Sequence, residues 1–172
     1  MNKKTRKLVY LSMLTTLAVA LHTFEASLAL PLPYGIKLGF ANIISLVTIE
    51  LFSAKEMAIV NILRVVLAGL LRGSMFSYTW FISAGGVLLS SLAIMFVRKF
   101  TKLPMVSTSI VSAIGHGVGQ ILVVVYIYQS WAMATWIIAL FATSIPTGIF
   151  TGIIANTIVT YLKKYTKNMN TH

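Results

Sequence analysis

The chain contains no cysteine and no aspartate, and it has only three acidic residues in 172 positions. The absence of cysteine excludes a disulfide framework, a thiolate metal site and a cysteine nucleophile. The absence of aspartate excludes a site that holds Mg²⁺ on a prenyl diphosphate, because a hard cation needs several carboxylate oxygens. A Walker A motif and a convincing Ser–His–acid set are missing as well. We therefore expect no catalysis, metal or cofactor on this chain.

Charged residues are scarce overall, at 10% of the chain, whereas 58% of the residues are hydrophobic. A soluble domain carries roughly 25% charged residues, so this chain lacks the polar surface that water requires. The net charge of +11 comes from short basic clusters between apolar runs, which is the pattern of membrane proteins. We expect the lipid bilayer to be its surroundings and nucleic acid not to be a partner.

Long apolar runs fill most of the sequence, and a spanning helix needs roughly 20 mostly apolar residues. We predict an all-α membrane bundle of six transmembrane helices in a single domain, residues 1–172. The second run is short, so it is tilted, packed inside the bundle or extended by residues 36–38, and the sixth can hold a kink at Pro146. The first run is too long for a typical signal peptide. The expected spans are residues 8–30, 36–52, 57–71, 76–97, 105–128 and 131–162.

The basic residues predict that both termini lie in the cytoplasm of a multi-pass protein of the cell membrane. With the N-terminus inside, eleven basic residues fall in cytoplasmic segments and only Lys37 and Arg72 fall outside, while Arg64 lies within a span. The eleven are Lys3, Lys4, Arg6, Lys7, Lys55, Arg98, Lys99, Lys102, Lys163, Lys164 and Lys167.

Arg64 is the most costly polar residue, because it lies about two turns into the third predicted span. Asn61 precedes it by three residues and therefore shares its face of the helix. An arginine at this depth needs a carboxylate, a carbonyl or a polar cavity. Two interpretations remain open: a structural ion pair with Glu25 or Glu50, or a group that binds an anion or takes part in proton coupling.

His22 and Glu25 lie one turn apart in the outer half of the first span. Because Glu25 is near the end of the span, we expect its carboxylate to reach the lipid headgroups. The alternative is that both side chains form the polar rim of an outward-facing pocket.

His116 and Gln120 lie four residues apart near the middle of the fifth span, so they share one face. Gly115 and Gly119 form a ridge that lets another backbone approach closely, and residues 148 and 152, both glycine, repeat that spacing in the sixth span. His116 is either a packing residue or part of a binding site.

Two further segments are candidate functional elements. Asn42 begins the second run just after residues 31–35, which form either a lid over an outer pocket or a plain turn. Ser12, Thr16 and Ala20 make a stripe of small residues on the first span, which allows close packing of a helix from this chain or from a partner.

Four segments together resemble the Gx transporter family, which is also labelled heptaprenyl diphosphate synthase component I. The resemblance extends over about residues 6–162. The segments are Gly35–Asn42, Asn61–Leu67, Ala84–Gly86 and Gly115–Gln120.

That family looks like the substrate-binding S components of energy-coupling factor (ECF) transporters. The resemblance implies six helices, cytoplasmic termini, and a first outer loop over the substrate site. It also implies docking through small residues of the first helix on a transmembrane coupling subunit that is powered by two ATPases. An Ala-xxx-Ala pattern is usual there, whereas this chain has Ser12, Thr16 and Ala20.

The expected function is thus uptake of a small solute with partner subunits. One alternative is a membrane subunit of a flavin- and quinone-linked extracellular electron-transfer assembly with a membrane-anchored redox protein. The other is a non-catalytic subunit of heptaprenyl diphosphate synthase. The expected substrate-binding residues are Asn42, Asn61, Arg64, His116 and Gln120.

Overall fold

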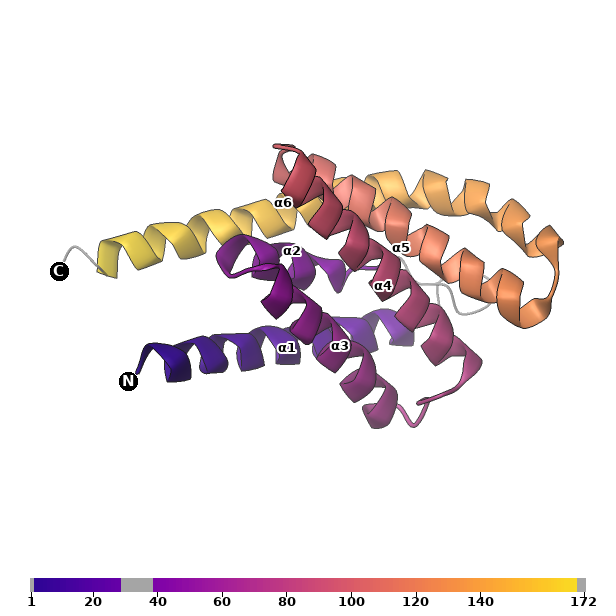
Figure 1. The fold of residues 1–172 in the computed structure, drawn as a ribbon, viewed down its shortest axis with the longest axis horizontal. Helices are drawn as coiled ribbons and strands as arrows, with labels where there is room; N and C mark the ends of the chain where they lie inside the picture. The colour runs from indigo at the N-terminus through magenta and orange to yellow at the C-terminus, as the bar shows by residue number, and fades with distance from the viewer. Residues whose placement is uncertain (1, 29–38, 170–172) are drawn as a thin grey trace.

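The computed structural model describes residues 2–28 and 39–169, with side chains placed up to residue 164. All regular elements in these ranges are helical. The predicted lid at residues 31–35 and the predicted outer residue Lys37 lie outside the described residues. The elements are α1 (Lys3–Ser27), α2 (Asn42–Leu51), α3 (Ala54–Leu71), α4 (Tyr78–Phe100), α5 (Met105–Tyr128), the 3₁₀ helix η2 (Trp131–Trp136) and α6 (Ile137–Met169) (Figure 1).

Four helical segments of the described chain are long and apolar enough to cross a membrane: α1, α4, α5 and the continuous stretch Trp131–Lys164. Of the six predicted spans, α2 and α3 do not meet these limits of length and apolar composition. The ten residues of α2 extend only about 15 Å, half of a hydrocarbon core of about 30 Å. The 18 residues of α3 include Lys55, Glu56 and Arg64, which lower its apolar character.

Several predicted boundaries also shift. The first helix ends at Ser27, before the predicted limit, and α6 continues past the predicted end at residue 162 to Met169. Residues 54–56, which the predicted spans leave outside any helix, form the first turn of α3, because the Ser53 hydroxyl caps it and accepts the Lys55 N–H at 3.2 Å. The helix α6 runs on through Pro146.

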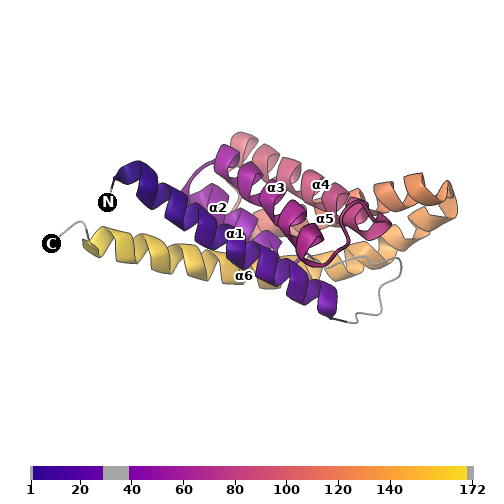
Figure 2. The same ribbon diagram turned by 90° about the horizontal axis from the view of Figure 1, so that it is seen from below.

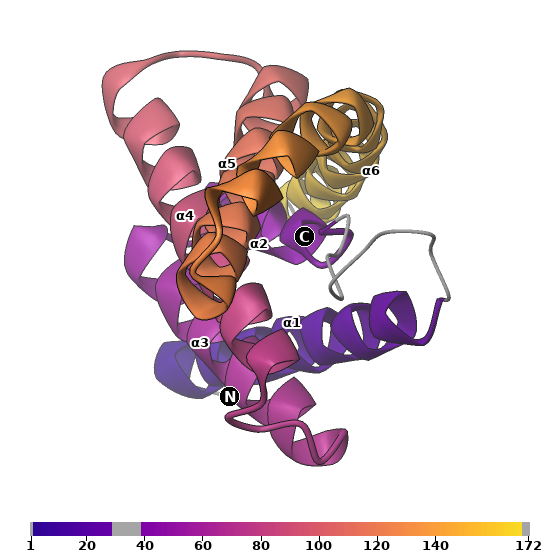
Figure 3. The ribbon, with the colours of Figure 1, turned by 90° about the vertical axis from the view of Figure 1, so that its right-hand side faces the viewer.

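The short helix α2 lies at the centre of the bundle and contacts all five other α-helices (Figure 3). Its residues 42–48 are all buried, so no face of that stretch is left for lipid. It begins after a tight turn at Gly39, whose φ of 88° favours glycine, and the Asn42 N–H closes this turn on the Gly39 carbonyl at 2.9 Å. Of the three alternatives for the second run, the structure has the packed interior helix.

Close packing of α4 on α5 depends on glycine. A β-carbon on Gly119 would collide with the carbonyl oxygen of Gly85 and lie 2.7 Å from its carbonyl carbon. A β-carbon on Gly115 would lie 3.1 Å from the Ala93 β-carbon, so both predicted ridge positions meet α4. The two backbones can approach this closely only because side chains are missing there.

The predicted second glycine ridge also packs against a helix. β-Carbons on Gly148 and Gly152 would each lie 2.7 Å from an α5 backbone atom, at Ile110 and Val106. The helices α4, α5 and α6 therefore form one closely packed half of the molecule. In the other half α1 packs on α3, and α2 lies between the halves (Figure 2).

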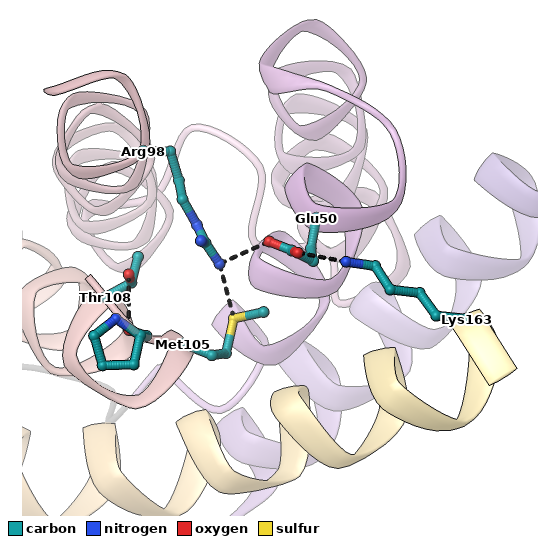
Figure 4. A network of polar contacts seen from close by, with 6 residues as sticks. Glu50, Arg98, Met105, Thr108 and Lys163 are labelled. Carbon is teal, nitrogen blue, oxygen red and sulfur yellow. Dashed lines mark hydrogen bonds and ion pairs between the residues drawn. The ribbon is translucent and has the colours of Figure 1, made fainter. Parts of the chain in front are cut away.

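The start of α1 and the end of α6 lie at the same end of the bundle (Figures 1 and 2), and the ion pairs join residues near the helix ends there. Lys7 pairs with Glu56 and links α1 to α3. Glu50 of α2 pairs with Arg98 of α4 at 2.8 Å and with Lys163 of α6 at 2.6 Å (Figure 4). The charged side chains thus link α1 to α3, and α2 to both α4 and α6, at one end of the molecule.

The outer surface of the helices is apolar. Ile62, Leu88 and Ile153, on three different helices, are 64%, 61% and 53% exposed. Many buried side chains, in contrast, are polar, including serines and threonines of α2, α4 and α5. This distribution is the inverse of that in a soluble protein, and it suits a chain surrounded by hydrocarbon.

A matched pair of glycine substitutions on α5 tests the packing of α4 on α5. We expect Gly119→Ala to destabilise the protein by about 1–3 kcal/mol, because the new methyl group overpacks the helix contact. We expect Gly117→Ala to be neutral or stabilising by about 0.5–1 kcal/mol, because alanine favours the helix. Its β-carbon would lie at an ordinary 3.5 Å from Leu140. Reversible unfolding in detergent measures both, and equal effects would contradict the packing described.

Candidate functional site

Arg64 lies at the centre of the bundle with only 1% of its surface exposed. It is held on α3, and its Nη2 donates a hydrogen bond of 3.2 Å to the side-chain oxygen of Asn42 on α2. Because Asn42 is the first residue of α2, the turn at Gly39 sets its position. The predicted residues Arg64 and Asn42 are thus brought together from two helices.

Glu25 is buried beside this pair, and its exposed fraction is 3%. Its carboxylate accepts a hydrogen bond from the Gly39 N–H and interacts electrostatically with Arg64. The expectation that Glu25 reaches the headgroups is therefore wrong. The side chain turns inward because the backbone N–H of the turn before α2 supplies a donor there. His22 is also buried, at 6% exposure.

His116 and Gln120 of α5 approach the same centre and are 4% and 0% exposed. A β-carbon on Gly39 would lie 3.1 Å from Asn42 Nδ2 and 3.3 Å from His116. A β-carbon on Gly86 of α4 would lie 2.8 Å from His116 and 2.9 Å from Gln120. Because Gly39 and Gly86 carry no side chain, Asn42, His116 and Gln120 have room beside them.

We call this group of side chains the central polar cluster. Its members come from α1, α2, α3 and α5, and Gly86 of α4 packs against two of them. The members are Glu25, Asn42, Arg64, His116 and Gln120.

Asn61 is buried as predicted but belongs to a separate network one turn along α3 from Arg64. Its side-chain oxygen accepts a hydrogen bond from Ser45 of α2 at 2.7 Å, and its Nδ2 donates one to Ser91 of α4 at 2.7 Å. Ser91 in turn donates to the carbonyl of Val87 at 2.6 Å. Sequence analysis missed both serines. Their occurrence within predicted spans is the signal that could have drawn attention to them.

An open groove of about 710 Å³ runs along α3, α4 and α5 beside this network, and the exposed side chains of Ile62 and Leu88 are among those that line it. Its lining is almost wholly apolar, with Asn61 and Ser91 among the few polar residues. Asn61 is the one predicted binding residue that borders it, because the other four lie in the central polar cluster.

Glu50, a candidate partner for Arg64 in the sequence, instead joins the ion pairs at the end of the bundle. Figure 4 shows its carboxylate between Arg98 and Lys163, which contact it at 2.8 and 2.6 Å. It lies in the last turn of α2, two residues beyond the buried stretch 42–48. The electrostatic partner of Arg64 is therefore Glu25.

The stripe predicted for partner docking faces outward. Ser12, Thr16 and Ala20 are all exposed on α1, and the Thr16 hydroxyl donates to the carbonyl of Ser12 at 3.0 Å, which hides part of its polarity. The described part of this chain therefore leaves these small residues uncovered.

The fold and the central polar cluster define a class of protein: a small helical bundle with a polar interior and helices long and apolar enough to cross a membrane. Within this class, the chain belongs to the heptaprenyl diphosphate synthase component I family, whose model matches residues 14–158. This match confirms the resemblance that the sequence segments indicated. Searches of curated proteins and of solved structures gave no match.

The ion pair between Lys7 and Glu56 has a measurable electrostatic consequence. The hydrogen bond from Lys7, with a second from Ser53, lowers the pKa of Glu56 from 4.5 to about 2. Glu56 lies in the first turn of α3, before the predicted span 57–71. Because the folded pKa is depressed, the stabilisation from this contact is present above about pH 4.5 and is lost as the pH falls toward 2.

We expect Lys7→Gln to raise the pKa of Glu56 toward 4.5, while the remaining bond from Ser53 keeps it below that value. Carbon-13 labelling of glutamate gives three carboxyl signals to titrate, since the chain has three glutamates. Lys4→Gln, on the same helix, is the control. An unchanged titration of Glu56 in Lys7→Gln would show that Lys7 is not its partner.

Proposed function

We propose that this chain is the membrane-embedded substrate-binding protein of an ECF-type transport system and takes up a small solute together with partner subunits. The observation that carries the proposal is the central polar cluster. Five polar side chains from four helices meet inside a bundle with an apolar surface. Polar groups are costly at such depth, and they typically line solute pathways in membrane proteins.

The arrangement of α2 supports a binding role. A short helix whose N-terminus lies at mid-bundle is a common way for transporters to place polar groups at a solute. Here that terminus carries Asn42 and follows the Gly39 turn, which contacts Glu25 and lies near His116. We therefore assign the solute site to Asn42, Arg64, His116 and Gln120, with Asn61 supporting the cluster from the next turn of α3.

The stripe of Ser12, Thr16 and Ala20 is the proposed docking surface for a transmembrane coupling subunit, which would work with its ATPases. Without a hydrophobic driving force between helices in lipid, close approach through small residues is a main source of helix association. The stripe is exposed on α1, as docking requires.

We place the end of the bundle that carries the ion pairs in the cytoplasm of a cell-membrane protein. The starts of α1 and α3 and the ends of α4 and α6 meet there, and they bring ten of the eleven cytoplasmic basic residues of the topology prediction. The eleventh, Lys102, follows α4 directly. Arg72 follows α3 at the opposite end. This asymmetry supports the positive-inside orientation.

We assign the chain a binding role and not an enzymatic one, because it lacks the aspartates that prenyl diphosphate chemistry uses. The name of the family supports one alternative function, that of a non-catalytic subunit of heptaprenyl diphosphate synthase. A membrane subunit of a flavin- and quinone-linked electron-transfer assembly is the other. The apolar groove along α3, α4 and α5 favours it, since an apolar groove on the outer face of the bundle suits a lipophilic redox molecule.

Capture of the tagged protein from its native membrane, followed by mass spectrometry, separates the three functions. We expect a transmembrane coupling subunit with ATPases to co-purify, and Thr16→Phe to abolish this by filling the docking stripe. Thr157→Phe on α6 is the matched control, because both threonines are exposed and both donate to a carbonyl four residues earlier.

Other partners would decide against transport. A redox protein without ATPases would favour the electron-transfer assembly, and a prenyl synthase catalytic subunit would favour the synthase. Equal loss in Thr16→Phe and Thr157→Phe would contradict the docking role of the α1 stripe.

A panel of vitamins, flavins and quinone precursors tests solute binding on the purified protein. A solute that binds only the folded state stabilises it by about 2.7 kcal/mol at a concentration 100 times its Kd, so at least one member should raise the melting temperature. The increase should be lost in Gln120→Leu and kept in the surface variant Lys102→Gln. If no member of the panel has an effect, the proposed solute-binding function fails.

A further inference from the structure

The central polar cluster contains hydrogen-bond donors that lack acceptors. Among the residues that the structure describes, Nε and Nη1 of Arg64 and Nδ2 of Asn42 have no hydrogen-bond acceptor. The two side chains are 1% and 4% exposed, and the bond from Arg64 Nη2 to Asn42 Oδ1 places their unused donors near one another. Buried donors without acceptors are rare in native proteins and call for an explanation.

The charge of Arg64 is also without a direct counterion in the described part of the chain. The three ion pairs there involve Glu50 and Glu56, and none includes Arg64. Glu25 interacts with Arg64 electrostatically, but its carboxylate accepts the hydrogen bond of the Gly39 N–H. A buried cation is stable only when its charge is balanced and its donors are bonded, so this guanidinium is incompletely compensated.

The donors of Arg64 and Asn42 that lack acceptors require a partner of one particular charge. Three N–H donors on adjacent side chains need acceptors, and one of these side chains is a permanent cation. A group that carries a negative charge and several acceptor oxygens meets both needs at once, as carboxylates and phosphates do when arginine binds them. A neutral solute would accept hydrogen bonds from these donors but would not balance the positive charge of Arg64.

We propose that the transported solute is an anion and that its carboxylate or phosphate group binds to Arg64 and to the amide of Asn42. This inference rests on the proposed function, because it names the chemical class of the solute in that same site. Arg64 is the anion-binding residue, and Asn42 orients it through the Nη2 bond while offering its own Nδ2 donor.

The charge of Glu25 affects how tightly a charged solute binds at Arg64. The negative charge of Glu25 interacts with Arg64 electrostatically without a hydrogen bond between them, so it would also repel an anion bound to Arg64. Removing that charge should tighten binding of an anion. Glu25→Gln is the suitable change, because the glutamine carbonyl can still accept the Gly39 N–H. For a cationic solute the same substitution would weaken binding, so the direction of the effect reports the charge of the solute.

The test compares probes that differ only in the anionic group, on the full chain in lipid nanodiscs. Suitable pairs are flavin mononucleotide with riboflavin, nicotinate with nicotinamide, and pantothenate with panthenol, with inorganic phosphate as the simplest probe. Nitrogen-15 labelling of arginine gives four Nε–H signals, because the chain has four arginines. The wild-type protein is used, and Arg64→Lys serves only to assign the buried signal.

We expect an anionic probe to shift the Arg64 Nε–H signal in a saturable way, whereas its neutral counterpart does not. Glu25→Gln should lower the Kd of that probe by roughly three- to tenfold, about 1.4 kcal/mol being a factor of ten. Asn42→Ala should raise the Kd by about tenfold, while Lys102→Gln leaves it unchanged. Arg98→Gln, at the end of the bundle, should leave the Arg64 signal in place.

The contrary outcomes separate this inference from the function on which it rests. If riboflavin, nicotinamide or panthenol stabilises the protein as strongly as its anionic counterpart, the chain binds solutes but the anion inference is wrong. If no probe, phosphate included, moves the Arg64 signal, Arg64 binds no anion and is a structural partner of Glu25. If Glu25→Gln weakens binding of the anionic probe, the charge of Glu25 does not repel an anion bound at Arg64, and the assignment is overturned.

Discussion

The burial of one permanent charge, that of Arg64, constrains the rest of this structure. A guanidinium in the middle of an apolar bundle requires acceptors and a negative charge within reach. Asn42 supplies an acceptor because α2 begins at mid-bundle, and Glu25 supplies the charge because the Gly39 turn draws its carboxylate inward. The short helix, the turn before it and the inward acid thus each compensate part of the charge of Arg64, and the donors that remain are those assigned to an anion.

Small residues make that arrangement possible in two different ways. On α4, α5 and α6 glycines bring three helices into close contact, and α2 packs between this half and the pair of α1 and α3. At the cluster itself Gly39 and Gly86 leave room beside His116 and Gln120. The closely packed half therefore serves as a rigid support. The ion pairs of Glu50 tie α2 to that support at its C-terminal end.

Local sequence patterns predicted the features that depend on local chemistry. The helix 105–128 was predicted with its observed bounds, and the cost of polar side chains within or beside apolar spans singled out Asn42, Asn61, Arg64, His116 and Gln120, all of which are buried. Features set by contacts distant in sequence were missed. Glu50 meets Lys163 across 113 positions, and Glu25 turns inward to a backbone N–H fourteen residues away. The helix α2 is short because the backbone turns at Gly39 just before it. The sequence shows that this residue is a glycine, but it does not show that its φ is positive.

The central claim is that hydrocarbon surrounds the apolar faces of these helices while the polar side chains meet inside. The most direct measurement places single spin-labelled cysteines, in a chain that has none of its own, at Ile62, Leu88 and Ile153. In lipid vesicles the account predicts that oxygen, which concentrates in hydrocarbon, relaxes these three labels strongly. A water-soluble nickel complex should relax them weakly, and it should strongly relax only a fourth label, placed at the exposed Lys55. Strong relaxation of the first three labels by the nickel complex would place those faces in water and contradict the account.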